Sequence, residues 1–356
     1  MSADGPTSPA PRAPLRFGEA LAFIRANANR NSSFALGSLA GRFVLMCAVQ
    51  NTDAPEAREA LAAIPRDVRD ETFRLCAIFA TAAADTLAPF ANRLVFTDAD
   101  ASATAGLADP TAPNGRWILF DRTLRVRRVW PLNEAQAALA ALEDATDAPA
   151  NAPVLVAPNV FEPDFCAVLI AYYEKNGGEA SGITQQDPTG RTFVTLDDAF
   201  KRREDCTIED AAIRDAAMKR IYWRLAPMIE RAFMWTPTRM ERYLVARYDA
   251  QSGGFFKPHR DNTTKGTAHR RFAVTINLNA EAYEGGDLRF PEFGPQTYRA
   301  PTGGAVVFSC SLMHEATPVT KGQRFAFLPF LYDEAAAKIR EANNKFLDES
   351  IATYSG

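Results

Sequence analysis

The chain has 356 residues, of which 47% are hydrophobic and 23% charged. This length is typical of about two domains, and the composition is typical of a soluble globular protein. The formal net charge of −3 provides no basic field for nucleic acids or anionic membranes, so we expect neither as a partner.

Terminal composition and cysteine usage predict the compartment. Apolar runs stop far short of the roughly 18 residues that a transmembrane helix needs. Residues 1–14 are rich in Pro, Ala and Ser and lack the apolar core of a secretory signal, so a disordered leader is predicted. The five cysteines show no close pairing, which suits a reducing cytosol. We therefore expect a cytoplasmic protein.

The first half alternates apolar runs with helical patterns. Continuous apolar runs such as residues 42–49 are typical of strands buried on both faces of a parallel sheet. In chain order we expect a helix in residues 17–29, a strand in 42–49, a helix in 54–64, a strand in 73–80, a helical stretch before Asn92, a strand in 94–96, a hairpin in 116–130 and a helix in 132–142. This order predicts an α/β sandwich.

With residues 36–42 leading into the first buried strand, this order resembles the thioredoxin-like fold in its peroxiredoxin variety, over about residues 17–142. The resemblance implies a reactive cysteine at the helix start after that strand. Residues 50–56 occupy this position without a cysteine, and the chain has no Cys-x-x-Cys. Cys47 and Cys76 lie inside apolar strands, where a thiol behaves as a small hydrophobic group.

For this first region we therefore expect a redox-inactive domain that serves interaction, dimerisation or substrate placement, and a homodimer is compatible with it. An active peroxidase is the alternative. A change of composition predicts where the region ends, because residues 144–153 contain only Ala, Asp, Thr, Asn and Pro and suit an exposed linker. The expected domains are thus residues 15–143 and residues 154–356.

Two helices are expected early in the second domain. The first covers residues 163–176 and ends at a Gly-Gly pair, which is a usual C-terminal stop. The second is the longest helical pattern of the chain, residues 210–233, with Met218 on its apolar side and a kink at Pro227. We expect both helices to pack on the outside of the sheet that follows.

Strands joined by turns follow from Met240 onwards, which is the pattern of an all-β sandwich or barrel. The expected strands are residues 241–248, 271–279, 288–290, 305–308 and 324–332. Residues 271–279 alternate, so that Thr275 and Asn277 lie on the face opposite to Val274 and Ile276. Such a set of strands predicts a double-stranded β-helix, or jelly roll.

Two of the three histidines belong to a candidate metal site. His259 and Asp261 are two residues apart, so on an extended backbone they project to the same side. His314 must come from another strand. Two histidines and one carboxylate form the facial triad that leaves open positions on non-haem Fe(II). Zinc is the weaker alternative, because the spacing matches neither a closed Cys/His site nor His-Glu-x-x-His.

Arg324 follows His314 by ten residues and lies on an aromatic strand beside Phe325 and Phe327. A guanidinium directed inwards among such residues needs an anion, and its fork matches a carboxylate bidentately. An exposed charge or a salt bridge is the alternative for Arg324 taken alone. Its position after the candidate third ligand favours the anion site.

Together these residues resemble the Fe(II)- and 2-oxoglutarate-dependent dioxygenases, and within them the prolyl 4-hydroxylase-like group, over about residues 154–332. The similarity is carried by Tyr248, by residues 253–261, 277–279, 284–291 and 314–319, and by Arg324. Arginine in place of the lysine of many collagen-type members indicates the arginine-using branch. Ala326 replaces a hydroxyl residue found in several relatives, so another side chain must assist Arg324.

The resemblance implies an iron site and a cosubstrate site. The implied Fe(II) ligands are His259, Asp261 and His314. The implied 2-oxoglutarate residues are Arg324 on the far carboxylate, with Tyr248, Asn277 and Thr275 in the pocket. No catalytic residue is predicted beyond these ligands.

The implied reaction hydroxylates a substrate C–H with O2 while 2-oxoglutarate gives succinate and CO2. Fe(II) is then the cofactor, 2-oxoglutarate and O2 are cosubstrates, and L-ascorbate is a further candidate. Halogenation is not expected, because Asp261 fills the position that a halide would need. Peptidyl proline, amino acids and small metabolites are all compatible substrates. The alternative is a non-catalytic sensor or binding module for iron, oxygen or the keto acid.

Charged residues outside these motifs have two readings each. The run at residues 201–205 is predicted to be a solvated loop, with a loop over a substrate mouth as the alternative. His269 is predicted to lie at the surface or to serve a hydrogen bond. Basic residues near the motif either solvate a loop or favour an acidic substrate: Lys257, Arg260, Lys265, Arg270 and Arg271.

Overall fold

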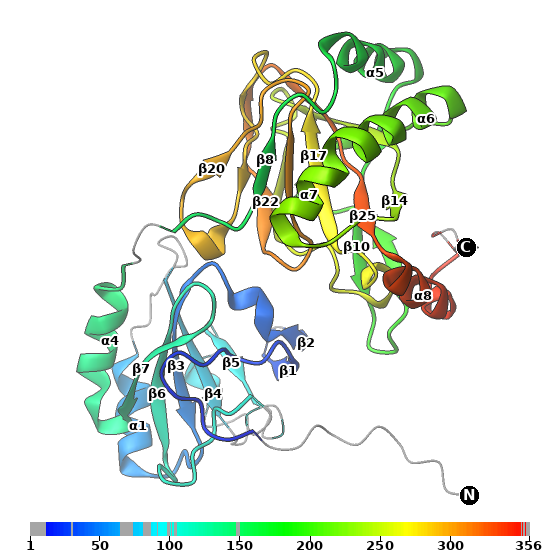
Figure 1. The fold of residues 1–356 in the computed structure, drawn as a ribbon. Coiled ribbons are helices and arrows are strands. Elements are labelled where there is room, and N and C mark those ends of the chain that lie inside the picture. The colour runs from blue at the N-terminus through cyan, green and yellow to red at the C-terminus, as the bar shows by residue number, and fades with distance from the viewer. Residues whose placement is uncertain are drawn as a thin grey trace, which may run out of the picture. The chain divides into compact units, whose positions relative to one another are not determined.

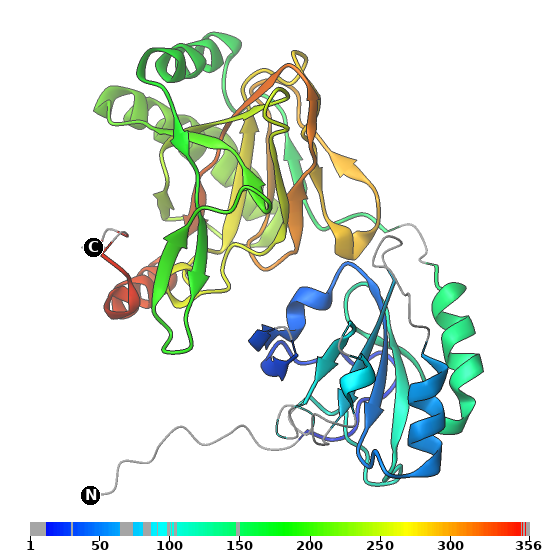
Figure 2. The same ribbon diagram turned by 180° about the vertical axis from the view of Figure 1, so that it is seen from behind.

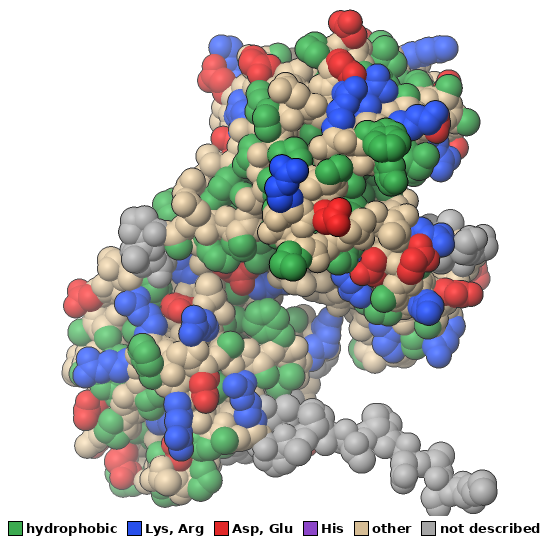
Figure 3. Space-filling view, viewed as in Figure 1, with side chains coloured by type: hydrophobic (Ala, Val, Ile, Leu, Met, Phe, Trp, Pro, Cys, Tyr) green, Lys and Arg blue, Asp and Glu red, His purple; other side chains and the backbone are tan. Residues whose placement is uncertain are grey.

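The computed structural model describes residues 12–29, 31–64, 74–80, 87–90, 92–97, 100, 102, 105–146, 150–349, 351 and 353. The chain forms two compact units, Met1–Ala150 with Pro291–Gly294 and Asn151–Phe290 with Pro295–Gly356, and each is built around β-sheet (Figure 1). Within the described residues, no helix has both the length and the apolar character to cross a membrane. Acidic and basic side chains are interspersed over the face seen in Figure 3.

The first unit contains a seven-stranded sheet in the order β2-β1-β5-β4-β3-β6-β7. Its strands are β1 (Arg25–Ala28), β2 (Asn31–Ala35), β3 (Phe43–Val49), β4 (Arg74–Ala80), β5 (Leu94–Phe96), β6 (Gly115–Phe120) and β7 (Val126–Pro131). The three central strands β3, β4 and β5 are parallel. β6 is antiparallel to β3 and forms a hairpin with β7.

Helices α1 (Pro55–Ala63) and α4 (Ala135–Glu143) share a core with the sheet. Alternate residues of β3, among them Leu45 and Cys47, pack in that core with alanines of both helices. All residues of β3 are buried, as a strand covered on both faces requires. Short 3-10 turns occupy Leu36–Leu39, Ala88–Phe90 and Leu132–Glu134.

The predicted strands of the first unit and the helices in residues 54–64 and 132–142 are confirmed. The predicted helix in residues 17–29 is wrong, because β1 pairs there with β2 and β5 and Phe23 is exposed. Strand pairing outweighed a weak helical periodicity. The helical stretch expected before Asn92 lies largely outside the described residues. The linker was expected to be exposed, yet Ala145 and Ala152 are buried.

The second unit contains a nine-stranded and a five-stranded sheet. The large sheet has the order β14-β25-β17-β24-β15-β13-β9, with β21 pairing to β17 and to β8. Its strands are β8 (Leu155–Ala157), β9 (Glu179–Ala180), β13 (Glu204–Thr207), β14 (Arg239–Glu241), β15 (Leu244–Asp249), β17 (Phe272–Asn277), β21 (Ala305–Ser309), β24 (Gln323–Phe327) and β25 (Phe330–Tyr332).

The small sheet has the order β12-β16-β22-β19-β20. Its strands are β12 (Lys201–Arg202), β16 (Phe255–His259), β19 (Leu288–Arg289), β20 (Thr297–Tyr298) and β22 (His314–Ala316). Two antiparallel pairs stand beside these sheets, β10 (Ile183–Gln186) with β11 (Thr192–Thr195) and β18 (Glu284–Gly285) with β23 (Val319–Lys321). The green β10–β11 hairpin is clearest from behind (Figure 2).

Helices cover the outer face of the large sheet. They are α5 (Pro163–Asn176), α6 (Ala211–Arg220), a π-helical turn (Ile221–Leu225) and α7 (Ala226–Phe233), with α8 (Glu334–Ala342) near the C-terminus. Buried residues of α5 to α7 share one core with Val274 and Ile276 of β17. Short 3-10 turns lie at Lys265–Thr267, Pro291–Phe293 and Asn344–Phe346. The prediction that these helices pack outside the sheet is confirmed.

The helix predictions hold with two corrections. α5 has the predicted bounds and ends at Gly177, whose φ of 74° favours glycine. The long helix is interrupted by the π-helical turn before Pro227, since proline cannot supply the backbone N–H of a regular turn. Met218 is 44% exposed and does not lie on the apolar side.

Two expected strands are each divided. Residues 241–248 break at Arg242, whose φ is 65°, and residues 324–332 break between Phe327 and Phe330. The predicted solvated loop at residues 201–205 is wrong, because Lys201 and Arg203 are only 5% and 8% exposed. This run forms β12 and the start of β13. Its charges are matched by residues distant in sequence, a signal that local composition does not carry.

Candidate active site

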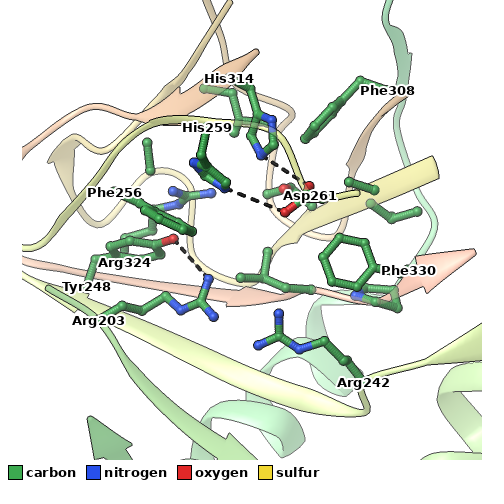
Figure 4. A pocket seen from close by; sticks show the side chains of 17 residues that line it. Arg203, Arg242, Tyr248, Phe256, His259, Asp261, Phe308, His314, Arg324 and Phe330 are labelled. Carbon is green, nitrogen blue, oxygen red and sulfur yellow. Dashed lines mark hydrogen bonds and ion pairs between the residues drawn. The ribbon is translucent and has the colours of Figure 1, made fainter. Parts of the chain in front are cut away.

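The principal pocket of the second unit opens between the two sheets (Figure 4) and has about 490 Å³ of empty space, part of it open to solvent. The large sheet supplies Tyr248, Thr275 and Arg324, and the small sheet supplies His259 and His314. The two sheets therefore bring together residues that lie far apart in the chain.

The metal-ligand candidates sit where two strands of the small sheet meet. His259 ends β16, His314 begins β22, and the two are register partners in an antiparallel pair. Asp261 follows in the next turn, with Oδ1 3.5 Å from Nε2 of His259 and Oδ2 3.3 Å from Nε2 of His314. One ligand atom from each residue lies within 4.8 Å of the others. Such a triangle can hold one ion.

Backbone carbonyls orient both imidazoles. Nδ1 of His259 lies 2.8 Å from the Lys257 carbonyl oxygen, and Nδ1 of His314 lies 3.1 Å from that of Leu312. A carbonyl oxygen can only accept a hydrogen bond, so each Nδ1 carries the proton. Each Nε2 then presents its lone pair towards Asp261, which is the tautomer that a metal ligand needs.

The charges of the ligand set also suit a cation. Burial would raise the pKa of Asp261, but His314 and His259 outweigh it and hold that pKa well below its usual range. Burial lowers the pKa of His314 to about 4, against the opposing effect of Asp261. At neutral pH the site thus contains a carboxylate beside a neutral imidazole, ready to bind a divalent metal.

Arg324 is the second anchor of the site. It lies on β24, is only 2% exposed, and its Nε and Nη1 have no hydrogen-bond partner among the described residues. Burying guanidinium nitrogens that lack acceptors is costly, so the position of Nε and Nη1 indicates an anion site. Gly286 leaves room beside it, because a Cβ there would lie 3.1 Å from Cδ of Arg324.

The other predicted cosubstrate residues occupy two adjoining hollows. Tyr248 and Thr275 line the principal pocket with Arg324. Asn277 lines a smaller hollow that also contacts Thr275 and Arg324. Nδ2 of Asn277 donates to the Ala300 carbonyl at 2.7 Å, while its Oδ1 has no partner within the described part of the chain. Thr275 and Arg324 line both hollows, whereas Tyr248 and Asn277 each line one of them.

Several pocket residues were missed by the sequence analysis. Arg203 and Arg242 line the pocket on the side facing away from the histidines in Figure 4. Phe256 stacks on the His259 ring, with centroids 3.5 Å apart. Tyr283 is buried beside Arg324, and burial raises the pKa of its hydroxyl although the charge of Arg324 opposes the rise. The charged run that contains Arg203 was the only available signal.

His269 takes no part in the pocket. It is 2% exposed, and its Nε2 lies 3.1 Å from Oε2 of Glu241, which also pairs with Arg270 and Arg340. The surface reading of His269 is wrong, and its Nε2 lies at ion-pair distance from Glu241, although neither ring nitrogen has a well-aligned hydrogen bond within the described residues. Burial lowers the pKa of His269 despite Glu241.

Comparison with known proteins now identifies the region that holds this site. Residues 243–332 match the model of the 2OG-Fe(II) oxygenase superfamily. The match contains His259, Asp261, His314 and Arg324, and it implies Fe(II) as cofactor with 2-oxoglutarate and O2 as cosubstrates. The oriented imidazoles and the unpartnered Arg324 fit this set.

Curated proteins that are similar to this region carry the name PKHD-type hydroxylase. The protein of Maricaulis maris is 33% identical over 25% of this chain and 41% of its own length. The protein of Shewanella frigidimarina is 39% identical in a match that covers 22% of this chain and 36% of that protein. The protein of Verminephrobacter eiseniae is 26% identical in a match that covers 36% of this chain and 60% of that protein. The chain thus spans less than two thirds of the length of these relatives.

Solved structures of prolyl hydroxylases are also similar. One is the prolyl hydroxylase of Trichoplax adhaerens with a hypoxia inducible factor peptide, at 16% identity and a TM-score of 0.38, covering 53% of this chain and 86% of that chain. Another is a prolyl-4-hydroxylase of Pseudomonas putida, at 18% identity and a TM-score of 0.38. The match covers 52% of this chain and 94% of that chain.

Proposed function

We propose that the second unit is an Fe(II)- and 2-oxoglutarate-dependent dioxygenase that hydroxylates a substrate C–H and releases succinate and CO2. The observation that carries this proposal is the pairing of the ligand triangle with Arg324 in one pocket. The superfamily match and the hydroxylase names of the relatives support it. Bound Fe(II) and 2-oxoglutarate would supply the activation of O2.

Each residue then has a defined role. His259, Asp261 and His314 would hold Fe(II), which with three protein ligands would still accept 2-oxoglutarate and O2. Arg324 binds the far carboxylate of 2-oxoglutarate through Nε and Nη1, the nitrogens that lack a partner among the described residues. Tyr248, Thr275 and Asn277 line the space around that carboxylate. The surrounding apolar side chains exclude water from the reacting centre.

The fold of this unit supports the same function. We propose a double-stranded β-helix of the prolyl 4-hydroxylase-like type over residues 154–356. Its support is the pair of sheets with the ligands on the small sheet and Arg324 on the large one. Peptidyl prolines, amino acids and small metabolites are the substrate classes that we propose to test.

For the first unit we propose a thioredoxin-like domain of the peroxiredoxin variety over residues 15–143, joined by a linker at 144–153. The parallel β3–β4–β5 core with the antiparallel β6–β7 hairpin supports it. All five cysteines of the chain are buried and free, so this domain would act through binding or dimerisation. A cytoplasmic location remains part of the proposal.

The decisive experiment measures succinate formed from 2-oxoglutarate by protein loaded with Fe(II) without oxygen and then exposed to air. Turnover that depends on both Fe(II) and the ligand triangle supports the proposal, even when no substrate is added, because uncoupled turnover also yields succinate. Absence of succinate in the loaded protein, at saturating 2-oxoglutarate and with candidate substrates, would refute it.

A further inference from the structure

Two arginines of the principal pocket have no role in the site as described so far. Arg203 lies between β12 and β13, and Arg242 lies in the turn between β14 and β15. Figure 4 shows both guanidinium groups on one side of the pocket, with His259 and His314 on the other. A molecule that bridges the pocket would meet the metal at one end and these arginines at the other.

The hydrogen bonds of these arginines leave donors unused. Nη2 of Arg203 and Nη2 of Arg242 both donate to Oδ2 of Asp205, at 2.7 and 3.0 Å. Nη1 of Arg203 also reaches the Tyr248 hydroxyl at 3.4 Å, while its buried Nε has no partner. For Arg242, the bond to Asp205 is the only hydrogen bond within the described residues.

The balance of charges around Arg203 and Arg242 also indicates an anion site at this end of the pocket. Two guanidinium groups share the single carboxylate of Asp205, so at least one positive charge is left over at this end of the pocket. Lys201 stands behind them with its amine on Ser181 Oγ and the Gly182 carbonyl and brings no negative charge, while burial lowers its pKa well below the usual value. Burial lowers the pKa of Arg242 to about 10, with Asp205 opposing, so both arginines stay charged at neutral pH.

The backbone supports a functional reading of Arg242. Its φ of 65° lies in the left-handed region, which a long side chain adopts rarely and only with backbone strain. Glycine or asparagine would adopt this turn more easily, and neither would reach the pocket. The turn also splits the strand predicted over residues 241–248, and its geometry lets Arg242 line the pocket.

We infer that Arg203 and Arg242 form a carboxylate subsite, so that the substrate of this site is a small acid or a chain end that presents its carboxylate there. This inference rests on the proposed dioxygenase function and names its substrate class. The excess of positive charge over Asp205 matches an anionic group of the substrate. The guanidinium forks supply the bidentate geometry that a carboxylate accepts.

The test uses protein loaded anaerobically with Fe(II) and saturated with 2-oxoglutarate, so that Arg324 is already occupied. The probes are N-acetyl-L-proline and N-acetyl-L-prolinamide, which differ at the carboxylate alone, and inorganic phosphate. Calorimetric titration should show that the acid binds at least about tenfold more tightly than the amide and more tightly than phosphate.

Substitutions distinguish binding at this subsite from a general electrostatic effect of removing one positive charge. Arg242→Gln should weaken binding of the acid about tenfold or more and leave the amide unaffected, whereas Arg242→Lys should restore part of the affinity. Arg242 is preferred to Arg203, because removing the more deeply buried Arg203 would leave Asp205 poorly compensated. Arg231→Gln, on the exposed end of α7, is the matched control and should change nothing.

Equal binding of acid and amide, no binding of either, or a preference for phosphate would overturn the subsite. So would an Arg242→Gln protein that binds the acid like wild type. Titration of 2-oxoglutarate into the Fe(II) protein distinguishes this failure from that of the proposed function. If 2-oxoglutarate binds and the acid does not, only the subsite is refuted; if 2-oxoglutarate itself fails to bind, the dioxygenase proposal falls.

Discussion

Tyr248 and Arg324 stand directly opposite each other on the adjacent strands β15 and β24, and the guanidinium carbon of Arg324 lies 4.9 Å from the centre of the Tyr248 ring. The ring flanks the guanidinium and favours its charge through a cation–π contact. The nitrogens without a hydrogen-bond partner in the described structure are then left for a ligand. The register between β15 and β24 thus determines how the Arg324 guanidinium is oriented in the pocket.

Substitution of Arg324 should act on the cosubstrate. In Arg324→Gln the charge-assisted hydrogen bonds are lost, which costs about 1.5–3 kcal/mol or roughly a 10- to 150-fold rise in the 2-oxoglutarate concentration needed. Succinate formation at increasing 2-oxoglutarate measures this. Iron content should stay at the wild-type level, because Arg324 contacts no metal ligand. An unchanged 2-oxoglutarate requirement would remove Arg324 from its assigned role.

The histidines allow a matched comparison. His259→Ala should lose metal binding, since two of three ligands no longer hold the ion in place. His269→Gln should keep it, because this ring packs beside Glu241 outside the pocket. Anaerobic titration with Fe(II) or Co(II) measures both variants. Equal metal affinity of His259→Ala and wild type would show that the triangle is not the metal site.

Cysteine chemistry should be absent from the first unit. Burial raises the pKa of Cys47 well above its usual value and that of Cys76 to about 12. Both thiols therefore stay protonated at neutral pH, and a thiol attacks peroxide far more slowly than a thiolate. Peroxide consumption by metal-free protein should be undetectable, and equal for wild type, Cys47→Ser and Cys76→Ser. A rate that disappears in either variant would establish a peroxidase.

Acid should destabilise the fold through Glu241. Burial would raise its pKa, but Arg270, His269 and Arg340 outweigh burial and hold it well below its usual range. A carboxyl group with a depressed pKa in the folded state stabilises the fold above its unfolded pKa of about 4.3, and this contribution is lost as the pH falls towards the folded pKa.

The variant Glu241→Gln tests this dependence. It should lower the free energy of unfolding at neutral pH by about 3–5 kcal/mol, because Arg270 and Arg340 lose their buried partner. Its stability should also decline less than that of wild type below about pH 4.3. Denaturant unfolding at several pH values measures both effects, with the exposed Glu230→Gln as control. Parallel pH profiles would contradict the assignment.

The sequence correctly predicted those helices and strands that are determined by residues within the element itself. The alternation in residues 271–279 predicted that Thr275 and Val274 lie on opposite faces of the strand. In the structure Thr275 lines the pocket, and Val274 packs in the core that the sheet shares with the helices. Helix α5 was predicted to the residue because Pro163 and Gly177 mark its ends. The metal-ligand candidates came together although only the histidines lie on strands, because Asp261 follows in the turn after β16.

The errors have a common physical origin in partners distant in sequence. Residues 201–205 read as solvated because their charges are dense, yet Asp205 is matched by Arg242 and Lys201 by Ser181. Residues 17–29 read as a helix because nothing local indicates pairing with β5. The role of Arg242 in the pocket could not be predicted for the same reason, and the only indication for Arg203 was the alternative that placed residues 201–205 over a substrate mouth. Sheet formation, not local propensity, brings them there.

The main-chain contacts of His259 and His314 have a consequence for how this site could diversify. Nδ1 of each imidazole lies against the backbone carbonyl two residues before it, so the main chain contributes to the alignment of both rings. Substitutions elsewhere around the pocket can then change what is recognised without disturbing the ion. A lineage of such proteins could exchange one set of reactants for another by altering residues such as Arg242, while the oxidising centre stays intact.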